Sequence, residues 1–282
     1  MLPTLTKSIN TGVLNIVKQH LKRNKLIPVL SFGFQSGKST EDCLEYATNY
    51  IMKSKRENKN CIGIFFDFSN AFNTVNIDKL RAIMTTMNFS EDVLQWVQNF
   101  LTNRKIIIQT ERGTVNMLTS KGLPQGDILS PTLFNIYTTE LHDTVEKEDT
   151  ITLQFADDFL KIVTGKTEEE AIEKAQVEIN KFADKARTLE LQLNEAKTKA
   201  MIFNTKDTDL NLKIENQTIE TVRSYKYLGI IVDKTLSFGS QVRTMKQKVG
   251  ERQKMLKIVS SIKKVQHRKL WYCFTKRYTG TS

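Results

Sequence analysis

The stretch that decides the fold is Ile151-Thr-Leu-Gln-Phe-Ala-Asp-Asp-Phe-Leu-Lys-Ile-Val163, where two aspartates separate two apolar runs. The runs predict two strands joined by a tight turn that carries Asp157 and Asp158. Another apolar run, Cys61-Ile-Gly-Ile-Phe-Phe66, ends at Asp67. A carboxylate beside a buried strand is costly unless it is paired. Three such carboxylates from distant parts of the chain suggest a bound divalent cation, and therefore phosphoryl chemistry.

Asp67 and Asp157 are the first candidates for metal ligands. Two divalent ions about 3.5–4 Å apart can clamp the attacking and leaving oxygens of an in-line displacement. Mg²⁺ suits this role because it takes few carboxylates and keeps sites for substrate phosphates. Neighbouring side chains on a strand point to opposite faces, so Asp158 reaches the same ion only if the turn re-aims it. An Asp-Asp pair alone is more often a simple turn, but the second strand ending in Asp67 favours the metal site.

The 282-residue chain is basic, with a formal net charge of +11 and an isoelectric point of about 9.4. Twelve of its Lys and Arg residues lie between Gln241 and Arg277, where Glu251 is the only acid. The same segment has an apolar period through Val242, Met245 and Val249, which predicts an amphipathic helix. Such a helix suits a polyanionic partner, although a solvated helix face is the simpler alternative.

The cysteines and the hydropathy pattern bear on the compartment. Cys43, Cys61 and Cys273 are odd in number and lack zinc spacing, so we expect neither a disulfide framework nor a zinc site, and we expect a reducing compartment. No apolar run approaches the roughly 18 residues of a membrane span, and the N-terminus lacks a signal-peptide pattern. The sequence therefore predicts a protein of a reducing compartment that does not span a membrane.

Apolar periods and capping signals predict an α+β fold with helices on one face of a mainly antiparallel sheet. Ser39 with Asp42 and Thr167 with Glu170 look like capping boxes, and Ser130-Pro131 looks like a helix start. The expected helices span 9–23, 39–53, 77–87, 90–101, 130–146, 167–189 and the segment after 240. The expected strands, besides the two apolar runs, span 106–110, 114–118, 199–203, 212–214 and 225–232.

Six segments, in one order over roughly residues 30–235, resemble the motifs of reverse transcriptases of non-LTR (LINE-type) retrotransposons. Phe66-Asp-Phe-Ser-Asn-Ala-Phe72 resembles the first catalytic motif, Gly122-Leu-Pro-Gln-Gly-Asp-Ile-Leu-Ser-Pro-Thr-Leu-Phe-Asn-Ile-Tyr137 the second, and Phe155-Ala-Asp-Asp158 the double-Asp box. Leu193-Asn-Glu-Ala-Lys-Thr198 and Tyr227-Leu-Gly-Ile230 resemble the two motifs that follow, and Phe32-Gly-Phe-Gln-Ser-Gly-Lys-Ser-Thr40 resembles the fingers motif.

The resemblance implies a right-hand polymerase with an antiparallel palm sheet backed by helices. Its expected parts are partial fingers at 1–60, a palm at 61–235 with a fingers insertion at about 77–118, and a partial, basic helical thumb at 236–282. The implied activity is RNA-directed DNA polymerisation, which joins a primer 3′-hydroxyl to a dNTP with two Mg²⁺ ions, or Mn²⁺ in their place. The implied partners are an RNA template and a DNA primer; protein partners are not indicated.

The resemblance also implies roles for individual residues. Phe72 matches the bulky gate under the incoming sugar, which disfavours a 2′-hydroxyl, and Lys197 matches the lysine that assists the leaving pyrophosphate. Alternatives remain open: Phe72 as a core aromatic, Lys197 as a surface lysine and 227–229 as a buried edge strand. The implied roles are metal binding for Asp67, Asp157 and Asp158, nucleotide binding for Gln125 and Gly126, primer grip for Tyr227, Leu228 and Gly229, and nucleic-acid contacts for Gly37, Lys38, Arg243 and Lys246.

The chain also departs from the family pattern. Gln35 stands where arginine is common, Asn73 where aspartate is common, and Asp127 where serine is common. The chain starts close before the fingers motif, and we expect a domain truncated at both ends. One alternative is therefore an inactive remnant that only binds nucleic acid. An RNA-directed RNA polymerase is another alternative, which Phe72 and the Gly122–Gly126 loop disfavour.

Overall fold

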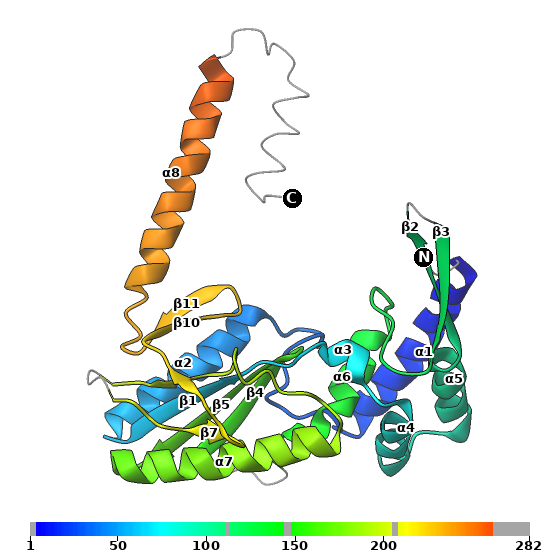
Figure 1. The fold of residues 1–282 in the computed structure, drawn as a ribbon, viewed down its shortest axis with the longest axis horizontal. Helices are drawn as coiled ribbons and strands as arrows, with labels where there is room; N and C mark the ends of the chain where they lie inside the picture. Colours follow the sequence, from blue (N-terminus) through cyan, green and yellow to red (C-terminus); the bar gives the residue numbers. More distant parts are fainter. Residues whose placement is uncertain (1–3, 111–112, 144–147, 205–207, 262–282) are drawn as a thin grey trace. The chain divides into compact units, whose positions relative to one another are not determined.

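The computed structural model describes residues 4–110, 113–143, 148–204 and 208–261. The chain divides into two compact units, Met1–Arg223 and Ser224–Ser282, and Figure 1 shows their elements. The helices of the first unit are α1 (Thr4–Arg23), α2 (Thr40–Arg56), α3 (Ala71–Thr74), α4 (Ile77–Thr86), α5 (Glu91–Leu101), α6 (Ser130–Tyr137), the 3₁₀ helix η1 (Thr139–Leu141) and α7 (Glu168–Thr188). Its strands are β1 (Asn60–Phe66), β2 (Arg104–Thr110), β3 (Gly113–Thr119), β4 (Thr150–Phe155), β5 (Asp158–Gly165), β6 (Lys199–Ile202), β7 (Lys213–Ile214), β8 (Gln217–Thr218) and β9 (Glu220–Thr221).

A five-stranded sheet in the order β4-β5-β1-β6-β9 forms the centre of the first unit. All of its pairs are antiparallel except β6 with β9. Strand β1 therefore lies between β5 and β6. The strand that Asp67 follows, β1, is thus the neighbour of the strand that begins with Asp158, β5. The α+β class with a mainly antiparallel sheet is confirmed.

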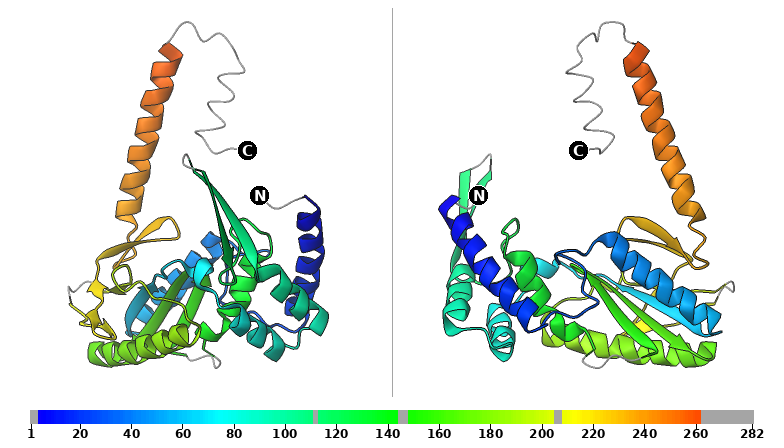
Figure 2. Two further views of the ribbon diagram at one scale, coloured as in Figure 1. Left: turned by 45° about the vertical axis from the view of Figure 1, so that its right-hand side comes forward. Right: turned by 180° about the vertical axis from the view of Figure 1, so that it is seen from behind.

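Helices cover both faces of this sheet, not one as expected (Figure 2). Ile62, Ile64 and Phe66 point to one face, where they share a core with Ile179 and Phe182 of α7. Helix α2 contacts β1 and β4 from the other side. Successive residues of β1 point alternately toward α7 and toward α2. Both faces of the strand are therefore covered, and every residue from Cys61 to Phe66 is buried.

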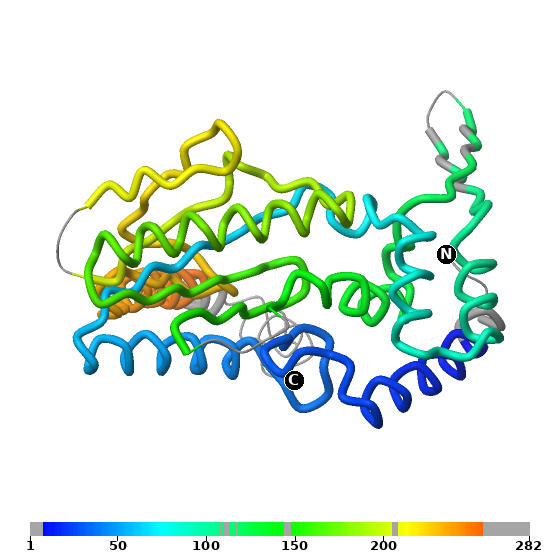
Figure 3. The backbone as a smooth tube through the Cα atoms, turned by 90° about the horizontal axis from the view of Figure 1, so that it is seen from below, coloured from blue at the N-terminus to red at the C-terminus, as the bar shows by residue number. Residues whose placement is uncertain are grey.

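Helices α1, α4, α5 and α6 lie beyond the carboxyl end of β1 (Figure 3). Val17 and Leu21 of α1 join the same core as the buried face of α4. His20 of α1 stacks on Phe89 with ring centroids 4.3 Å apart, and its Nε2 lies 2.8 Å from the Met87 carbonyl. The hairpin β2–β3 extends from this helical part.

The second unit contains the hairpin β10 (Ser224–Tyr227) and β11 (Ile230–Asp233), followed by α8 (Gly239–Ser261). Asp233 organises the connection to α8, because its carboxylate accepts hydrogen bonds from Thr235, Ser237 and Phe238. Partial burial raises the pKa of Asp233, but the hydrogen bonds outweigh it and lower that pKa to about 2. Among the described helices, none combines the length and apolar character that crossing a bilayer requires.

The capping box of Ser39 and Asp42 is confirmed in both directions. At the second predicted box Thr167 accepts from the Glu170 amide, but the Glu170 carboxylate accepts from the Lys166 amide, so only half of the box forms. Two other expectations are wrong. The helix from Ser130 ends at Tyr137, not near Glu146, and its N-cap position is Leu129. The expected strand 225–232 is two strands, because Leu228 and Gly229 both adopt positive φ and turn the chain back. Residues 262–282 of the basic tail lie outside the described residues.

Candidate active site

The strand register brings the aspartates to one end of the sheet. Phe66 pairs with Phe159, so Asp67 directly follows β1 at the end where β5 begins with Asp158. Phe155 pairs with Asp158 across a two-residue turn of Ala156 and Asp157. Ala156 has a φ of +58°, as expected at the first position of a type II′ turn. A slip of one residue in either register would separate the three carboxylates.

The three carboxylates lie close enough for their charges to act on one another. Loss of solvent around its carboxyl, together with the charges of Asp157 and Asp67, raises the pKa of Asp158 to about 6. Partial burial also raises the pKa of Asp67; the charge of Lys197 opposes that rise and the charge of Asp157 adds to it. Like charges crowded in this way favour a cation between them.

Lys197 comes to Asp67 because its segment runs alongside the chain that follows β1. The Asn194 amide donates to the Asp67 carbonyl at 2.8 Å, and the Ser69 amide donates to the Gln192 carbonyl at 2.9 Å. The Asp67 amide in turn lies 3.4 Å from Thr198 Oγ1. Lys197 is exposed, and its charge acts on the Asp67 carboxylate.

The donor set suits a hard divalent cation whose remaining coordination positions are filled by water or by substrate oxygens. Among the described residues, no group of three or more His, Cys, Asp or Glu side chains is arranged to hold one ion by itself. Mg²⁺ is commonly held by one or two carboxylates plus substrate phosphates. Asp67, Asp157 and Asp158 fit that pattern in chemistry and in charge.

The loop before α6 packs against α3, which brings Phe72 and Gln125 to the same region. The Leu123 amide donates to the Phe72 carbonyl at 2.7 Å and the Gly122 amide to the Val75 carbonyl at 2.8 Å. Gly122 is required there, because a Cβ would lie 2.6 Å from the Asn73 carbonyl oxygen and its φ is +78°. The Phe72 ring is half-buried and stacks on Phe134 with centroids 4.4 Å apart. Gln125 is exposed.

The backbone at Gly126 is open, since a Cβ there would meet nothing within 4 Å, and its φ is +82°. Asp127, by contrast, is buried. Its Oδ1 accepts from the Leu129 amide at 2.8 Å and its Oδ2 from Asn10 Nδ2 at 2.6 Å. Asp127 therefore supplies the helix start that was expected of Ser130, and α1 fixes the loop through Asn10.

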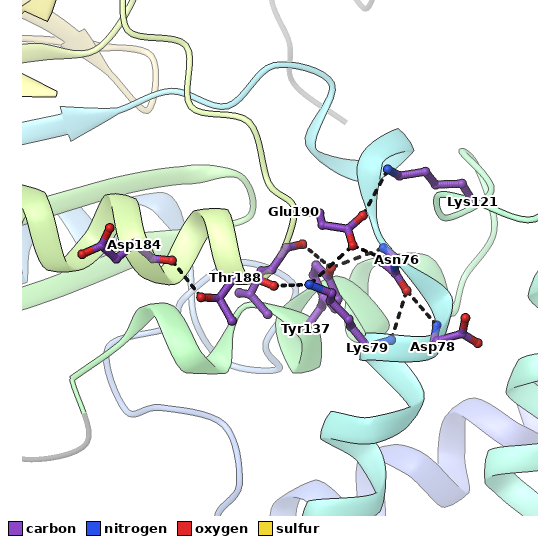
Figure 4. Close-up of polar contacts among 9 residues, drawn as sticks. Asn76, Asp78, Lys79, Lys121, Tyr137, Asp184, Thr188 and Glu190 are labelled. Carbon is purple, nitrogen blue, oxygen red and sulfur yellow. Dashed lines mark hydrogen bonds and ion pairs between the residues drawn. The ribbon is translucent and has the colours of Figure 1, made fainter. Parts of the chain in front are cut away.

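A polar cluster around Glu190 joins the same loop to the ends of α7 and α4 (Figure 4). The Glu190 carboxylate accepts from Asn76 Nδ2 at 3.0 Å and lies 3.4 Å from both Lys79 and Lys121. The hydrogen bond from Asn76, with help from the two lysines, lowers the pKa of Glu190. The Tyr137 hydroxyl accepts a hydrogen bond from the backbone amide of Asn76 at 3.3 Å and donates one to the Leu189 carbonyl. The cluster therefore ties the start of the loop, at Lys121, to α4 and to Glu190, which follows the end of α7.

Two of the predicted nucleic-acid residues, Gly37 and Lys38, lie in the loop before α2. Lys38 donates to the carbonyls of Val29 and Ser31, and its ammonium lies 4.8 Å from the centre of the Phe32 ring. Partial burial lowers the pKa of Lys38. In this structure its ammonium group stabilises the loop through the two hydrogen bonds to Val29 and Ser31. Gly37 has a φ of +76° in an open turn.

In the second unit, Tyr227 is buried, and Leu228 and Gly229 form the β10–β11 turn. Arg243 and Lys246 are exposed on α8. The primer-grip role of Tyr227, Leu228 and Gly229 stays a prediction.

Four polar residues near the site were missed by sequence reasoning. Asn10, Asn135 and Gln154 are each at most 1% exposed, and Thr138 is fully buried. The only signal for them was a polar residue within an apolar run, as at Gln154 between Leu153 and Phe155.

The family model described as reverse transcriptase (RNA-dependent DNA polymerase) matches residues 1–232. The chain is 22% identical over 266 residues to a probable RNA-directed DNA polymerase from transposon BS of Drosophila melanogaster, covering 91% of this chain and 29% of that protein. It is 24% identical over 255 residues to the RNA-directed DNA polymerase from mobile element jockey of the same species, covering 88% of this chain and 28% of that protein. The chain therefore spans less than a third of the length of these relatives.

Solved structures give the same fold. Telomerase from Candida tropicalis, in complex with a fragment of telomeric RNA, matches 83% of this chain and 37% of its own, with a TM-score of 0.59 and 14% identity. Telomerase from Candida albicans in a similar complex matches 80% of this chain and 37% of its own, also with a TM-score of 0.59, at 13% identity. The predicted resemblance to polymerases of non-LTR elements is confirmed by the curated relatives.

Proposed function

Since the chain belongs to the reverse transcriptase (RNA-dependent DNA polymerase) family, we propose that it extends a DNA primer on an RNA template. The primer 3′-oxygen forms a bond to the α-phosphorus of a dNTP, the α–β phosphoanhydride bond breaks, and pyrophosphate leaves. The observation that carries the proposal is the convergence of Asp67, Asp157 and Asp158 at one sheet end with Lys197 beside them.

Asp67, Asp157 and Asp158 would hold the Mg²⁺ ions, with Mn²⁺ as a substitute. Bound there, the ions supply Lewis acidity for the attacking and leaving oxygens. The protein supplies the orientation of the carboxylates through the register of β1, β4 and β5. Lys197 offers an ammonium group to the charge that develops on the departing pyrophosphate.

Two further elements select the nucleotide. The exposed Gln125 and the open backbone at Gly126 offer hydrogen-bonding groups to the incoming nucleotide. The half-buried ring of Phe72 stacks on Phe134, and the Phe72 carbonyl binds the Leu123 amide of the same loop. A 2′-hydroxyl placed against this ring would lose its hydration without gaining a partner, so the site favours dNTP over rNTP.

The second unit would hold the duplex. The turn at Leu228 and Gly229 would contact the primer end, and the exposed Arg243 and Lys246 of α8 would contact phosphates. An RNA–DNA hybrid is close to A-form, which proteins recognise mainly by shape and backbone. Binding is therefore expected to weaken steeply with salt.

The test is extension of a DNA primer on an RNA template, with dNTP and rNTP compared at each of several salt concentrations. Wild-type protein is expected to incorporate the templated dNTP, and Phe72→Ala to accept rNTP at least about tenfold better, corresponding to roughly 1.4 kcal/mol. Phe100→Ala, at another half-buried ring that stacks on Trp96, is the matched control. A folded protein that binds the hybrid but incorporates nothing would refute the proposal and identify a nucleic-acid-binding remnant.

A further inference from the structure

The turn that carries the two aspartates is not explained by its own residues. Ala156 has a φ of +58°, a region that costs a residue with a Cβ about 1–2 kcal/mol. Glycine, asparagine or aspartate is the usual residue at such a position. A strained residue persists only where its surroundings determine its conformation. The cause of this conformation must therefore lie in the tertiary contacts of the turn.

Gln154, two residues before Ala156, makes those contacts. It is fully buried. Its backbone amide donates to the Leu30 carbonyl at 3.0 Å, and its carbonyl accepts from the Phe32 amide at 2.7 Å. Its Nε2 donates to the Ala156 carbonyl at 2.9 Å, so the side chain holds the peptide group that joins Ala156 to Asp157.

The rest of the Gln154 amide is also satisfied, which fixes its orientation. Nε2 donates a second hydrogen bond to Thr138 Oγ1 at 2.8 Å, and that hydroxyl lies 2.9 Å from the Phe134 carbonyl as a donor. The remaining oxygen, Oε1, lies 2.9 Å from His142 Nε2. Because an amide oxygen only accepts, the hydrogen of the imidazole must lie on Nε2.

His142 stays neutral in this environment. Burial lowers its pKa to about 4, although the hydrogen bond to Gln154 acts in the opposite direction. A neutral imidazole with its hydrogen on Nε2 holds the Gln154 amide in the orientation that directs Nε2 toward Ala156.

The segment Leu30–Gly33 closes the other side of the turn. Gly33 packs so closely that a Cβ there would lie 2.2 Å from the Ala156 nitrogen. Asn135 Nδ2 donates to the Gly33 carbonyl at 2.7 Å and holds the segment against the turn. The turn is therefore held by two contacts: the hydrogen bond from Gln154 to the Ala156 carbonyl, and the close packing of Gly33 against the Ala156 nitrogen.

We propose that Gln154, oriented by His142 and Thr138, is a positioning residue that holds the Ala156 carbonyl so that Asp157 and Asp158 are presented together to the cation. The inference rests on the proposed function, because it concerns the same carboxylates. Gln154 itself does not touch a ligand. A merely structural Gln154 would affect the stability of the fold and leave the carboxylates of the folded protein unchanged.

The key variant is Gln154→Leu, which removes the donor to Ala156 at similar volume. Thr152→Val is the matched control: Thr152 lies two residues earlier on the same strand, is 4% exposed, and its buried Oγ1 has no hydrogen-bond partner. The measurement is the Kd of Mn²⁺ by calorimetry on the folded chain without nucleic acid. We expect Gln154→Leu to weaken Mn²⁺ binding at least tenfold and Thr152→Val to change it less than twofold.

A second variant covers the case in which Gln154→Leu does not fold. In Gln154→Glu the ionised carboxylate accepts from His142 but cannot donate to Ala156, whereas the protonated form can. Mn²⁺ affinity relative to wild type is therefore expected to recover as the pH is lowered from 8 to 6. Thr152→Val, which adds no titratable group, serves again as the control and should show no such recovery.

The outcomes separate the two claims. Unchanged Mn²⁺ affinity in folded Gln154→Leu, or a Gln154→Glu affinity ratio that does not depend on pH, overturns the inference. If Mn²⁺ binding depends on Gln154 but primer extension is absent, the inference holds and the proposed polymerase activity fails.

Discussion

Two hairpin turns of equal length, Ala156-Asp157 and Leu228-Gly229, reach positive φ by different means. The β10–β11 turn has the conformation of a type I′ turn, with φ of +47° at Leu228 and +84° at Gly229, and a Cβ on Gly229 would meet nothing. The β4–β5 turn has no glycine and depends on contacts from Gln154 and Gly33. The first turn has a glycine at one of its two positive-φ positions, whereas the positive φ of the second turn falls on an alanine that distant parts of the fold hold in place. Substitutions at those distant positions should therefore disturb the turn that carries the aspartates more than the β10–β11 turn.

The largest expected effect comes from Gly33→Ala, which breaks the contact between the Leu30–Gly33 segment and the turn. Its Cβ would lie 2.2 Å from a backbone nitrogen that cannot swing away. We expect a loss of about 3 kcal/mol in the free energy of unfolding, measured with urea. Gly12→Ala is the control, since Gly12 lies in α1 with nothing within 4 Å, and it should stabilise by roughly 0.5–1 kcal/mol. Equal effects of the two variants would refute the close contact.

Acid should disturb the two hairpins in different pH ranges. Above pH 6.5 His142 is neutral whether the chain is folded or not. Between pH 6.5 and about 4, His142 is protonated in the unfolded chain but stays neutral in the folded chain. The free energy of unfolding therefore falls by up to about 3 kcal/mol as the pH is lowered through this range. Asp143 favours protonation of His142, and Lys161 and Lys185 oppose it. Asp233, with its lowered pKa, contributes stability above pH 3.8 that is lost only as the pH falls toward 2.

Hydrogen exchange at a series of pH values checks this order. Amides of 150–163 should lose protection between pH 6 and 4, while those of 224–238 keep it. His142→Gln, which cannot titrate, should make protection of 150–163 less dependent on pH in that range. Earlier opening of the β10–β11 hairpin on acidification would contradict the account.

The smallest expected effects come from changing the glycine content of each turn. Gly229→Ala should cost about 1–2 kcal/mol, because only its φ is unfavourable for a Cβ. Ala156→Gly relieves a similar strain but adds chain entropy to the unfolded state, so its net effect should lie within about 1 kcal/mol of zero. Thermal unfolding of both variants measures the difference. A larger loss for Ala156→Gly than for Gly229→Ala would argue against confinement of the Ala156 turn by its surroundings.

The same comparison explains how much the sequence could predict. Apolar runs placed β1, β4 and β5, and the turn between Leu228 and Gly229 carries its own glycine. The bond from Asn10 to Asp127 joins residues 117 positions apart, and no local pattern announces it. Gln154 looked like an irregularity in an apolar strand, because its side-chain partners are Thr138 and His142, on either side of η1, and the Ala156 carbonyl of the turn itself. The sequence thus identified the aspartates but not the groups that hold them.

The helix expected over 130–146 shows a related failure. Ser130-Pro131 is a sound start signal, but Asp127 already binds the Leu129 amide and the helix ends after Tyr137. A 3₁₀ turn at Thr139–Leu141 follows and leads to His142. Its position is set by tertiary hydrogen bonds of Thr138 and His142 to Gln154, which helix propensity does not reflect.

The central claim is that the three aspartates form the working centre of a polymerase, and single-turnover primer extension with Mg²⁺ tests it most directly. The comparison is between wild type, Asp157→Asn and the control Asp184→Asn, an exposed aspartate of α7 that pairs with Arg187. The account predicts templated incorporation by wild type and by Asp184→Asn, and a rate at least about 10³-fold lower in Asp157→Asn. Equal rates for Asp157→Asn and wild type, or no incorporation by folded wild type bound to its RNA–DNA hybrid, would contradict it.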